Sequence, residues 1–332
     1  MNTRRPVNTL AGPVDSDRLG PTLMHEHVIV CTPELDLNRP EYWRDEELLV
    51  NISQGLKRLS DNGVSTIVDL TVMGIGQSIP ILLQVARSVD LNIVVATGFY
   101  TFNELPRNPM FMNGYRTNDA GFAEPDFSVP TDRPDPLEEK FVRDIEVGIE
   151  QTGVRAGVLK CVTEVYGVTT GIERVLRAVA RTQLRTGVPI STHSHPGTRN
   201  GLEQQRIFRE EGVDLSRVVI GHSGDSQDLD YLQSLIQNGS YIGMDRFGAR
   251  PPGVEARMDV VAELCKRGFA DRMVLSHDCA LHYSSIARID EKWLVMQAEV
   301  LPGLRERGVP ESDINQMMVV NPAQVLMPNP ID

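Results

Sequence analysis

Four histidines in this sequence stand where a metal ion could bind. His25 and His27 alternate in the sequence Met24-His25-Glu26-His27, and in a strand both would point to one face while Glu26 points away. His193 and His222 end two further apolar runs. Imidazole nitrogens bind borderline divalent metals at about 2.0–2.1 Å. Buried structural histidines would explain one alternating pair equally well, but histidines at several strand ends favour a shared metal centre.

Asp278 and Lys160 extend this set with an acidic and a basic group. The Asp278 carboxylate could bind a metal and accept a proton from water, or it could cap a helix. Lys160 ends the apolar run 157–160 and could simply extend into solvent. Beside metal cations, however, burial and like charge lower the pKa of a lysine. A neutral amine captures carbon dioxide, so the sequence predicts N6-carboxylysine at Lys160, an anion able to bridge two metal ions.

The other three histidines receive no ligand role. His195 lies two residues after His193 and could share its face or lie beyond the strand. His277 adjoins Asp278 and should face away from it. Both are therefore predicted to support the site or the surrounding structure. His282 lies in a predicted loop and is expected to be exposed.

Eight short runs rich in β-branched residues must position these side chains. Most are followed by an amphipathic stretch, such as 46–61, 172–185, 201–211 and 228–237, and this alternation predicts the parallel βαβ units of an α/β protein. Eight such units close into a (β/α)8 TIM barrel, whose strand ends converge on one site at the C-terminal face. We expect a binuclear metal centre there. The predicted strands are 22–30, 66–70, 92–100, 156–162, 189–193, 218–222, 241–244 and 273–276.

One long segment, 103–137, interrupts this alternation. It carries prolines at six positions and therefore cannot form one regular helix. A loop of this length is usually functional or disordered. Because the segment follows the third predicted strand, it should lie on the active-site face. We interpret it as a lid or entrance wall inserted into a single barrel domain that spans residues 1–332.

The composition excludes several kinds of partner. The chain has 33 basic and 45 acidic residues, and its net charge of −12 disfavours nucleic acid and anionic membranes. No run approaches the ~20 apolar residues of a membrane helix, and the N-terminus lacks the apolar stretch of a signal peptide. Four cysteines without CxxC spacing predict buried, reduced thiols. We therefore expect a cytoplasmic protein with a small-molecule ligand.

The predicted ligands lie in motifs that resemble the phosphotriesterase family of the amidohydrolase superfamily. Within that family, Asp245-Arg246 and Thr97-Gly98-Phe99-Tyr100 resemble the phosphotriesterase-like lactonases, which include N-acyl-homoserine lactonases. The resemblance covers nearly the whole chain. The motifs that carry it are His25-x-His27, Lys160, Thr192-His193, Gly221-His222-Ser223 and Ser276-His277-Asp278, together with the connecting sequences 201–208 and 239–247.

This resemblance implies how the ligands are shared. His25, His27 and Asp278 would hold one metal ion, and His193 and His222 would hold the other. Carboxylated Lys160 and a hydroxide would bridge the two ions. Zinc is the expected metal, and cobalt, manganese or iron would suit the same nitrogen and oxygen donors.

The activity that the resemblance implies is hydrolysis of a lactone. The metal-bridging hydroxide would open the ring of an N-acyl-homoserine lactone or a related lactone, a quorum-quenching reaction. Asp278 would take the proton, Tyr100 would stabilise the oxyanion, and Arg246 would position the substrate or its loop. Tyr100 could instead be a core aromatic residue, and Arg246 could form a structural ion pair with Asp245 or a loop acid. The family also implies a homodimer and a promiscuous phosphotriesterase activity.

Other readings compete with the lactonase. An organophosphate triesterase or another carboxylesterase could use the same centre. Lys160 argues against a mononuclear, deaminase-like amidohydrolase, because one metal ion needs no bridging anion. The complete ligand set argues against a non-catalytic metal-binding module, because a degenerate site usually loses a ligand.

Two loops, 103–137 and 280–293, depart from the usual lactonase sequence and are predicted to set acyl-chain preference. Both follow strands and would overhang the site. Phe111 and Ile286 are predicted to bind substrate as parts of an apolar groove. The alternative is that these loops only pack onto the barrel. The other groove candidates are Met110, Met112, Leu281, Tyr283 and Ile289.

Overall fold

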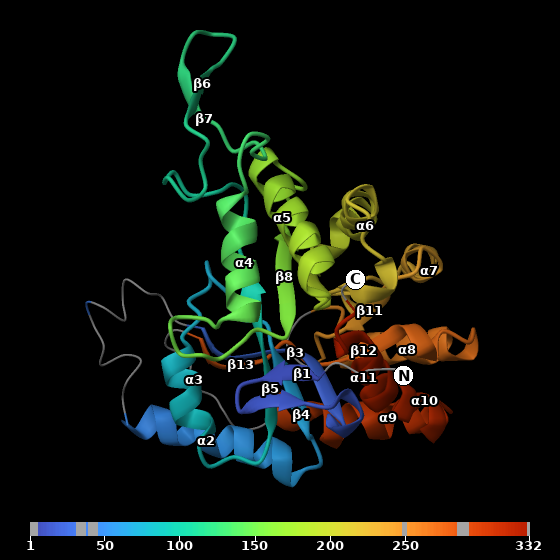
Figure 1. Ribbon diagram of the computed structural model, residues 1–332. Coiled ribbons are helices and arrows are strands. Elements are labelled where there is room, and N and C mark those ends of the chain that lie inside the picture. The colour runs from blue at the N-terminus through green and yellow to red at the C-terminus, as the bar shows by residue number, and fades with distance from the viewer. Residues whose placement is uncertain (1–5, 31–37, 39–45, 248–250, 284–291, 331–332) are drawn as a thin grey trace.

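A parallel sheet that curls into a barrel forms the centre of the molecule. The computed structural model describes residues 6–30, 38, 46–247, 251–283 and 292–330. All neighbouring strands in the sheet run parallel. Helices cover its outer face (Figure 1), so the predicted (β/α)8 barrel is confirmed. In spatial order the strands are β12 (Met273–Leu275), β11 (Tyr241–Met244), β10 (Val218–Ile220), β9 (Ile190–Ser194), β8 (Val158–Thr163), β5 (Asn92–Gly98), β4 (Thr66–Asp69), β3 (Thr22–Val30) and β13 (Ala280–Tyr283).

The eighth barrel strand is divided into two parts. β12 pairs with β11, whereas β13 pairs with β3, with Ala280 opposite His27. Residues 276–279 lie between the two parts. They connect β12, beside the seventh barrel strand β11, to β13, beside the first barrel strand β3. This short break carries Asp278, so the place where the barrel closes is also the place where a predicted ligand enters the site.

The barrel helices begin and end where the sequence indicates. In α5 (Thr170–Thr186), the Thr169 hydroxyl accepts the Ile172 amide, and Gly187 ends the helix at a φ of 74°. The predicted 46–61 stretch is α2 (Glu46–Asp61). The remaining helices of the described chain are α3 (Ile79–Ala86), α4 (Pro136–Glu146), α6 (Asn200–Glu210), α7 (Leu229–Gln237), α8 (Val254–Lys266), α9 (Leu301–Glu306), α10 (Glu311–Asn315) and α11 (Asn321–Leu326).

Short elements lie outside the repeating units. The hairpin of β1 (Val7–Thr9) and β2 (Gly12–Val14) precedes β3. At the C-terminal end of α11, the carbonyls of Gln324 and Val325 accept from the buried Arg217, each at 2.9 Å. Arg217 thus satisfies carbonyls in the last turn of that helix. Within the described residues, no helix is long and apolar enough to cross a membrane.

The 103–137 segment is irregular, as predicted, but it also contains an unpredicted hairpin. β6 (Tyr115–Thr117) and β7 (Ala123–Pro125) pair in antiparallel fashion and project beyond α4 and α5 (Figure 1). The base of the segment is anchored. Arg174 of α5 is fully buried and donates to both carboxylate oxygens of Asp135 at 2.9 Å and to the Phe111 carbonyl. Its role as a lid stays a prediction.

The assignment of Phe111 to a substrate groove is wrong. Phe111 is buried in the main core, with its ring 4.7 Å from that of Phe99. Its partners are other core residues because the anchored base of the segment folds inward. Met110 and Met112 are partly buried against the same core. Ile286 and Ile289 lie outside the described residues, as do the side chains of Leu281 and Tyr283.

The predicted thiols are buried where the structure describes them. Cys161 and Cys265 are buried free thiols, and Cys279 is also buried. Burial raises the pKa of Cys161 to about 12, although nearby Lys160 opposes the shift. This thiol is therefore protonated and acts as a small core residue. Cys31 lies outside the described residues.

Candidate metal centre

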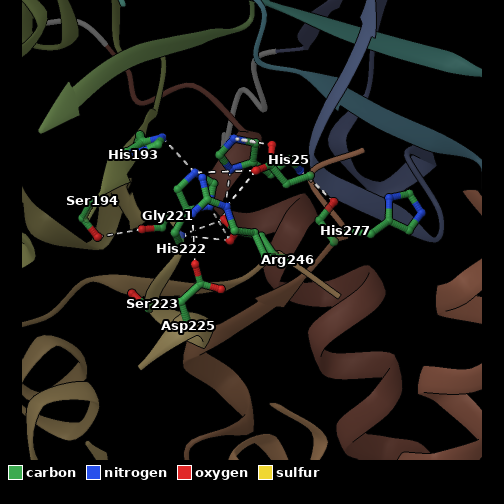
Figure 2. A network of polar contacts seen from close by, with 12 residues as sticks. His25, His193, Ser194, Gly221, His222, Ser223, Asp225, Arg246 and His277 are labelled. Atoms are coloured by element: carbon green, nitrogen blue, oxygen red, sulfur yellow. Dashed lines mark hydrogen bonds and ion pairs between the residues drawn. The ribbon is translucent and has the colours of Figure 1, made fainter. Parts of the chain in front are cut away.

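The predicted ligands converge at the C-terminal ends of the barrel strands. Figure 2 shows the rings of His25, His193 and His222 directed toward one another, from three different strands. Nζ of Lys160, on β8, lies 2.9 Å from Nε2 of His25, on β3. His25, His222 and Asp278 each offer one ligand atom, and these atoms lie within 4.8 Å of one another. One divalent cation could therefore reach all three.

Asp245 fixes the rings of His25 and His222. Its two carboxylate oxygens accept from Nδ1 of His25 and Nδ1 of His222, both at 2.9 Å, and Asp245 is buried. Burial opposes ionisation of Asp245, but the electrostatic interaction and hydrogen bond with the His25 ring and the hydrogen bond from the His222 amide outweigh burial and lower its pKa. Because an ionised carboxylate only accepts, each Nδ1 carries the proton. The Nε2 lone pairs of both rings are left for a metal.

His27 is held by a different partner. Its Nδ1 lies 2.9 Å from the hydroxyl of Thr71, just after β4, and this contact orients the ring so that Nε2 lies 3.3 Å from Oδ1 of Asp278. The same Asp278 oxygen lies 3.7 Å from Nε2 of His25. The alternation predicted for β3 thus brings both rings to the interior, next to the same carboxylate.

His193 and His222 form a second donor pair. Nε2 of His193 lies 3.0 Å from the Glu164 carboxylate, which leaves Nδ1 as its acceptor nitrogen. That Nδ1 lies 3.0 Å from Nε2 of His222. Two acceptor nitrogens at this separation repel each other unless a cation lies beside them. Both are within reach of one metal ion at about 2.0–2.1 Å, so the donors fit a second metal.

The buried imidazoles are neutral, as metal ligands must be. Burial, together with the charge of nearby Lys160, lowers the pKa of His25, and the charge of Asp245 opposes this only in part. Burial lowers the pKa of His193 to about 4, despite the opposing hydrogen bond that its Nε2 donates to Glu164. The pKa of His222 is held well below its usual range by burial and by Arg246. All three rings therefore offer lone pairs near neutral pH.

Lys160 has the environment that carbamate formation requires. It is buried, and burial lowers its pKa to about 8, against the opposing charges of Asp278 and Asp245. A substantial share of this amine is therefore neutral near pH 8. Backbone packing fixes its position, because a Cβ at Gly98 of β5 would lie 1.8 Å from the Lys160 carbonyl oxygen. The alternative in which Lys160 extends into solvent is wrong.

Asp278 is a point where several contacts meet. Its backbone adopts a left-handed φ of 50° in the break between β12 and β13, and it caps none of the described helices. Nε of Arg246 donates to its Oδ2 at 2.8 Å. Burial would raise the pKa of Asp278, but the electrostatic interactions with the His222 and His25 rings and the hydrogen bond with His27 lower it well below its usual range. Asp278 is therefore an ionised acceptor.

Arg246 forms ion pairs with two loop acids, Asp278 and Asp225, rather than with its sequence neighbour Asp245. It joins Asp278 to Asp225, which accepts from Nη1 of Arg246 at 2.9 Å. Arg257 donates to the other Asp225 oxygen at 2.5 Å. Figure 2 shows Arg246 lying between the histidines and Asp225. Arg246 thus forms a structural ion pair and also lies beside the predicted metal ligands.

Tyr100 lies at the edge of the site and is not a core residue. Its hydroxyl donates to Oε1 of Glu164 at 2.8 Å, and its ring lies edge-on to His193, with centroids 5.6 Å apart. Burial and the charge of Glu164 raise the pKa of Tyr100, so the phenol stays protonated. Burial opposes ionisation of Glu164, but hydrogen bonds with His193 and Tyr100 lower its pKa to about 2.

Two of the three remaining histidines, His277 and His195, take no part in the cluster that the structure describes. His277 points away from it (Figure 2) and contacts Glu26, with Nδ1 2.7 Å from Oε2. Burial alone would lower the pKa of His277, but the charge of Glu26 and Cys279 raises it well above its usual range. His195 lies beyond the end of β9, before a short 3-10 turn. The side chain of His282 is outside the described residues.

Three supporting residues were not identified from sequence as parts of the site. They are Glu164, Thr71 and Asp225, which hold His193, His27 and Arg246. Each comes soon after the end of a barrel strand, β8, β4 or β10, and that position was the available signal. Their partners lie far away in the chain, so residue type alone could not single them out.

Replacing Asp245 with asparagine is expected to weaken metal binding by about 10–100-fold, the usual effect of losing a group that supports metal ligands. An asparagine has one acceptor oxygen and could not accept from both Nδ1 atoms. One of the two rings would then lose its fixed orientation. Equilibrium dialysis against zinc checks this. Unchanged affinity in a folded variant would show that the rings are held by packing alone.

Comparisons with known proteins agree with this geometry. The family model described as the phosphotriesterase family matches residues 5–326. A phosphotriesterase homology protein of Mycobacterium tuberculosis is 48% identical over 328 residues, covering 96% of this chain and 97% of that protein. An aryldialkylphosphatase of Saccharolobus solfataricus is 33% identical, covering 93% and 95%.

A solved structure matches as closely. The structure of the phosphotriesterase from Mycobacterium tuberculosis superimposes with a TM-score of 0.87 at 47% identity, covering 97% of this chain and 98% of that one. The match in sequence and in fold leads to one conclusion. The chain belongs to the phosphotriesterase family and is a hydrolase of that family.

Proposed function

We propose that this hydrolase is a lactonase that opens N-acyl-homoserine lactones or related lactones, with phosphotriesters as secondary substrates. The observation that carries the proposal is a pair of side chains that border the ligand cluster, Arg246 and Tyr100. Arg246 contacts Asp278 directly, and the protonated Tyr100 hydroxyl lies across the site on Glu164. Both are hydrogen-bond donors at the edge of the ligand cluster.

Two divalent cations are the cofactors that the donor set fits. His25, His27 and Asp278 would hold one, His193 and His222 the other, and carboxylated Lys160 would contact both. Cations held there would supply Lewis-acid polarisation of the ester and activation of water at neutral pH. Zinc suits these nitrogen and oxygen donors, as do cobalt, manganese and iron.

The chain's own residues supply the rest of the chemistry. Asp278 is an ionised carboxylate in the centre of the cluster, so it can take a proton from the attacking water and deliver it to the leaving alkoxide. Tyr100 can donate to the oxygen that gains charge in the transition state. Arg246 cannot exchange its proton at neutral pH, because its ion pairs raise its pKa further. We therefore assign it a positioning role.

A planar lactone needs less room around the reacting atom than a tetrahedral phosphotriester does. Tyr100, bonded to Glu164, and Arg246, bonded to Asp278, both border the ligand cluster and would crowd the substituents of a phosphotriester. Phe102 is 65% exposed and lies edge-on to Tyr100, with centroids 5.4 Å apart. This exposed ring replaces Phe111 as the apolar surface that an acyl tail would contact.

A phosphotriester is the second candidate substrate. It is favoured by the name of the relative from Saccharolobus solfataricus, an aryldialkylphosphatase, at 33% identity. The predicted homodimer and cytoplasmic location stay predictions.

A hydrolysis screen tests the proposal. Purified zinc- or cobalt-loaded enzyme is assayed with a pH indicator on lactones of increasing acyl length, on an aryl dialkyl phosphate and on an N-acyl amide. We expect kcat/KM to be highest on a lactone, because the site presents donors to a single carbonyl oxygen.

The matched control is Tyr166→Phe, which changes an exposed tyrosine two residues beyond Glu164. Tyr100→Phe should lower kcat on lactones, and Tyr166→Phe should not. A higher kcat/KM on the phosphotriester than on every lactone would reverse the order of the two candidates.

A further inference from the structure

A buried carboxylate, Glu26, lies behind the metal site, on the side of β3 opposite His25 and His27. The side chain is fully buried, and within the described residues its basic partner is His277, with Nδ1 2.7 Å from Oε2. In that part of the chain its hydrogen bonds go to one short segment, the break between β12 and β13. This segment contains Asp278, the only acidic ligand in the proposed set.

The contacts of Glu26 bracket Asp278 on both sides. Oε1 accepts from the Ser276 hydroxyl at 2.5 Å and from the His277 amide at 3.1 Å. Oε2 lies 2.7 Å from Nδ1 of His277 and accepts from the Cys279 amide at 3.1 Å. One carboxylate therefore holds the residues before and after Asp278 while leaving Asp278 itself free to face the metals.

The backbone at Asp278 needs such support. Its φ of 50° lies in the left-handed region, which a non-glycine residue adopts at an energetic cost and keeps only where its surroundings impose it. The β-ladder does not impose it, because β12 ends at Leu275 and β13 begins at Ala280. Direct backbone bonds do contribute, since the Asp278 amide donates to the His25 carbonyl at 3.1 Å.

The same contacts link the two histidines to Asp278. The Ser276 hydroxyl, which donates to Glu26, also accepts the His25 amide at 2.8 Å. The His27 amide donates to the Cys279 carbonyl at 3.0 Å. Glu26 lies between His25 and His27 in sequence, so its side chain and their backbone hold the segment from one strand.

We propose that Glu26 is a positioning residue for the metal centre, which sets the Asp278 carboxylate in the place where it meets His25 and His27. The alternation in His25-Glu26-His27 then has two uses. His25 and His27 face the metal site, and Glu26 holds the segment 276–279, which supplies the third ligand, Asp278. The inference rests on the proposed function, because it takes Asp278 to be a metal ligand.

The test compares metal binding by the full-length wild type, Glu26→Gln and Ser276→Ala. Apoprotein is titrated with Co²⁺, and the dissociation constant and the visible d–d absorption are recorded, so the readout does not depend on turnover. Glu26→Gln keeps the size of the side chain but replaces one acceptor oxygen by an amide NH2, a donor that faces other donors. We expect its Co²⁺ affinity to fall about 10–100-fold, with a changed d–d spectrum.

Ser276→Ala removes one of the four bonds to Glu26 and, with it, the acceptor of the His25 amide, so it tests the link that runs from His25 through Ser276 to Glu26. It should fold even if Glu26→Gln does not, and we expect a smaller loss of affinity in the same direction. The destabilisation control is Ile242→Ala, in the barrel wall on β11, where the side chain is fully buried and away from the break. Its melting temperature should fall while its Co²⁺ affinity and spectrum stay those of the wild type.

The outcomes separate the two proposals. If wild type binds no Co²⁺, the proposed function fails and this inference fails with it. If wild type binds Co²⁺ and both Glu26→Gln and Ser276→Ala bind it equally well with the same spectrum, the metal centre stands and Glu26 has no positioning role. An equal loss of affinity in Ile242→Ala would also overturn the inference, because the effect would then be general destabilisation.

Discussion

Replacing Lys160 with alanine is expected to remove most of the bound metal and nearly all activity. In wild type we expect two equivalents of divalent metal per chain. Lys160 is buried, and its Nζ lies 2.9 Å from Nε2 of His25, so it is the group placed to contact both ions as a carbamate. The loss of kcat/KM should exceed the roughly 100-fold typical of groups that only support metal ligands.

Metal analysis together with steady-state kinetics checks this expectation. Acetate or propionate should partly restore metal content and turnover in Lys160→Ala, because a small carboxylate can enter the space that the side chain vacates. The control is Lys57→Ala, which removes an exposed lysine paired with Asp61 and should change neither quantity. Full activity in Lys160→Ala, or in a wild type that holds a single metal ion, would contradict the binuclear centre.

Replacing Asp135 with alanine is expected to cause the largest loss of stability outside the site. Asp135 receives two bonds at 2.9 Å from the guanidinium of Arg174, and both side chains are buried. Removing the carboxylate leaves a buried positive charge without its partner, which costs about 3–5 kcal/mol in comparable pairs. Asp135 also caps α4 by accepting the Leu137 amide at 2.9 Å. The free energy of unfolding should therefore fall by about this amount.

Urea denaturation measures the change. The control on the same helix is Glu139→Ala, which breaks a solvent-exposed pair with Arg185 at 2.6 Å. An exposed pair contributes about 0–1 kcal/mol, so this variant should stay close to wild type. The double variant Asp135→Ala with Arg174→Leu should recover part of the loss, because it removes the unpaired charge. If Asp135→Ala loses no more stability than Glu139→Ala, the buried pair does not anchor the 103–137 segment.

The strand-end positions of the ligands could be predicted because they depend on local periodicity. β3 spans Thr22–Val30, the range expected from its apolar run, and a period of two is enough to place His25 and His27 on one face. The barrel then brings the ends of separate strands to one face, which is a property of the fold class. Lys160 and His193 needed no further information to be grouped with them.

The 103–137 segment shows where such reasoning stops. Phe111 is apolar and follows a strand. An apolar residue is expected there both in a substrate groove and in the core, so the residue type does not distinguish the two. What decides between them is Arg174, 63 residues away, whose guanidinium binds the Phe111 carbonyl and draws the segment inward. The hairpin of β6 and β7 was also not expected, because its strands are three residues long and carry no clear alternation.

Residue types and their spacing along the chain were thus sufficient for the barrel, the family and the identity of the proposed ligands. Only the tertiary structure decided how those ligands are oriented. Asp245 lies 220 positions from His25, and Glu26 lies 251 positions from His277, yet these contacts set a ring tautomer and hold a strained backbone. Periodicity reports which way a side chain points from its own strand. It carries no information on which distant group the closed barrel brings against that side chain, because strand order and register place that group.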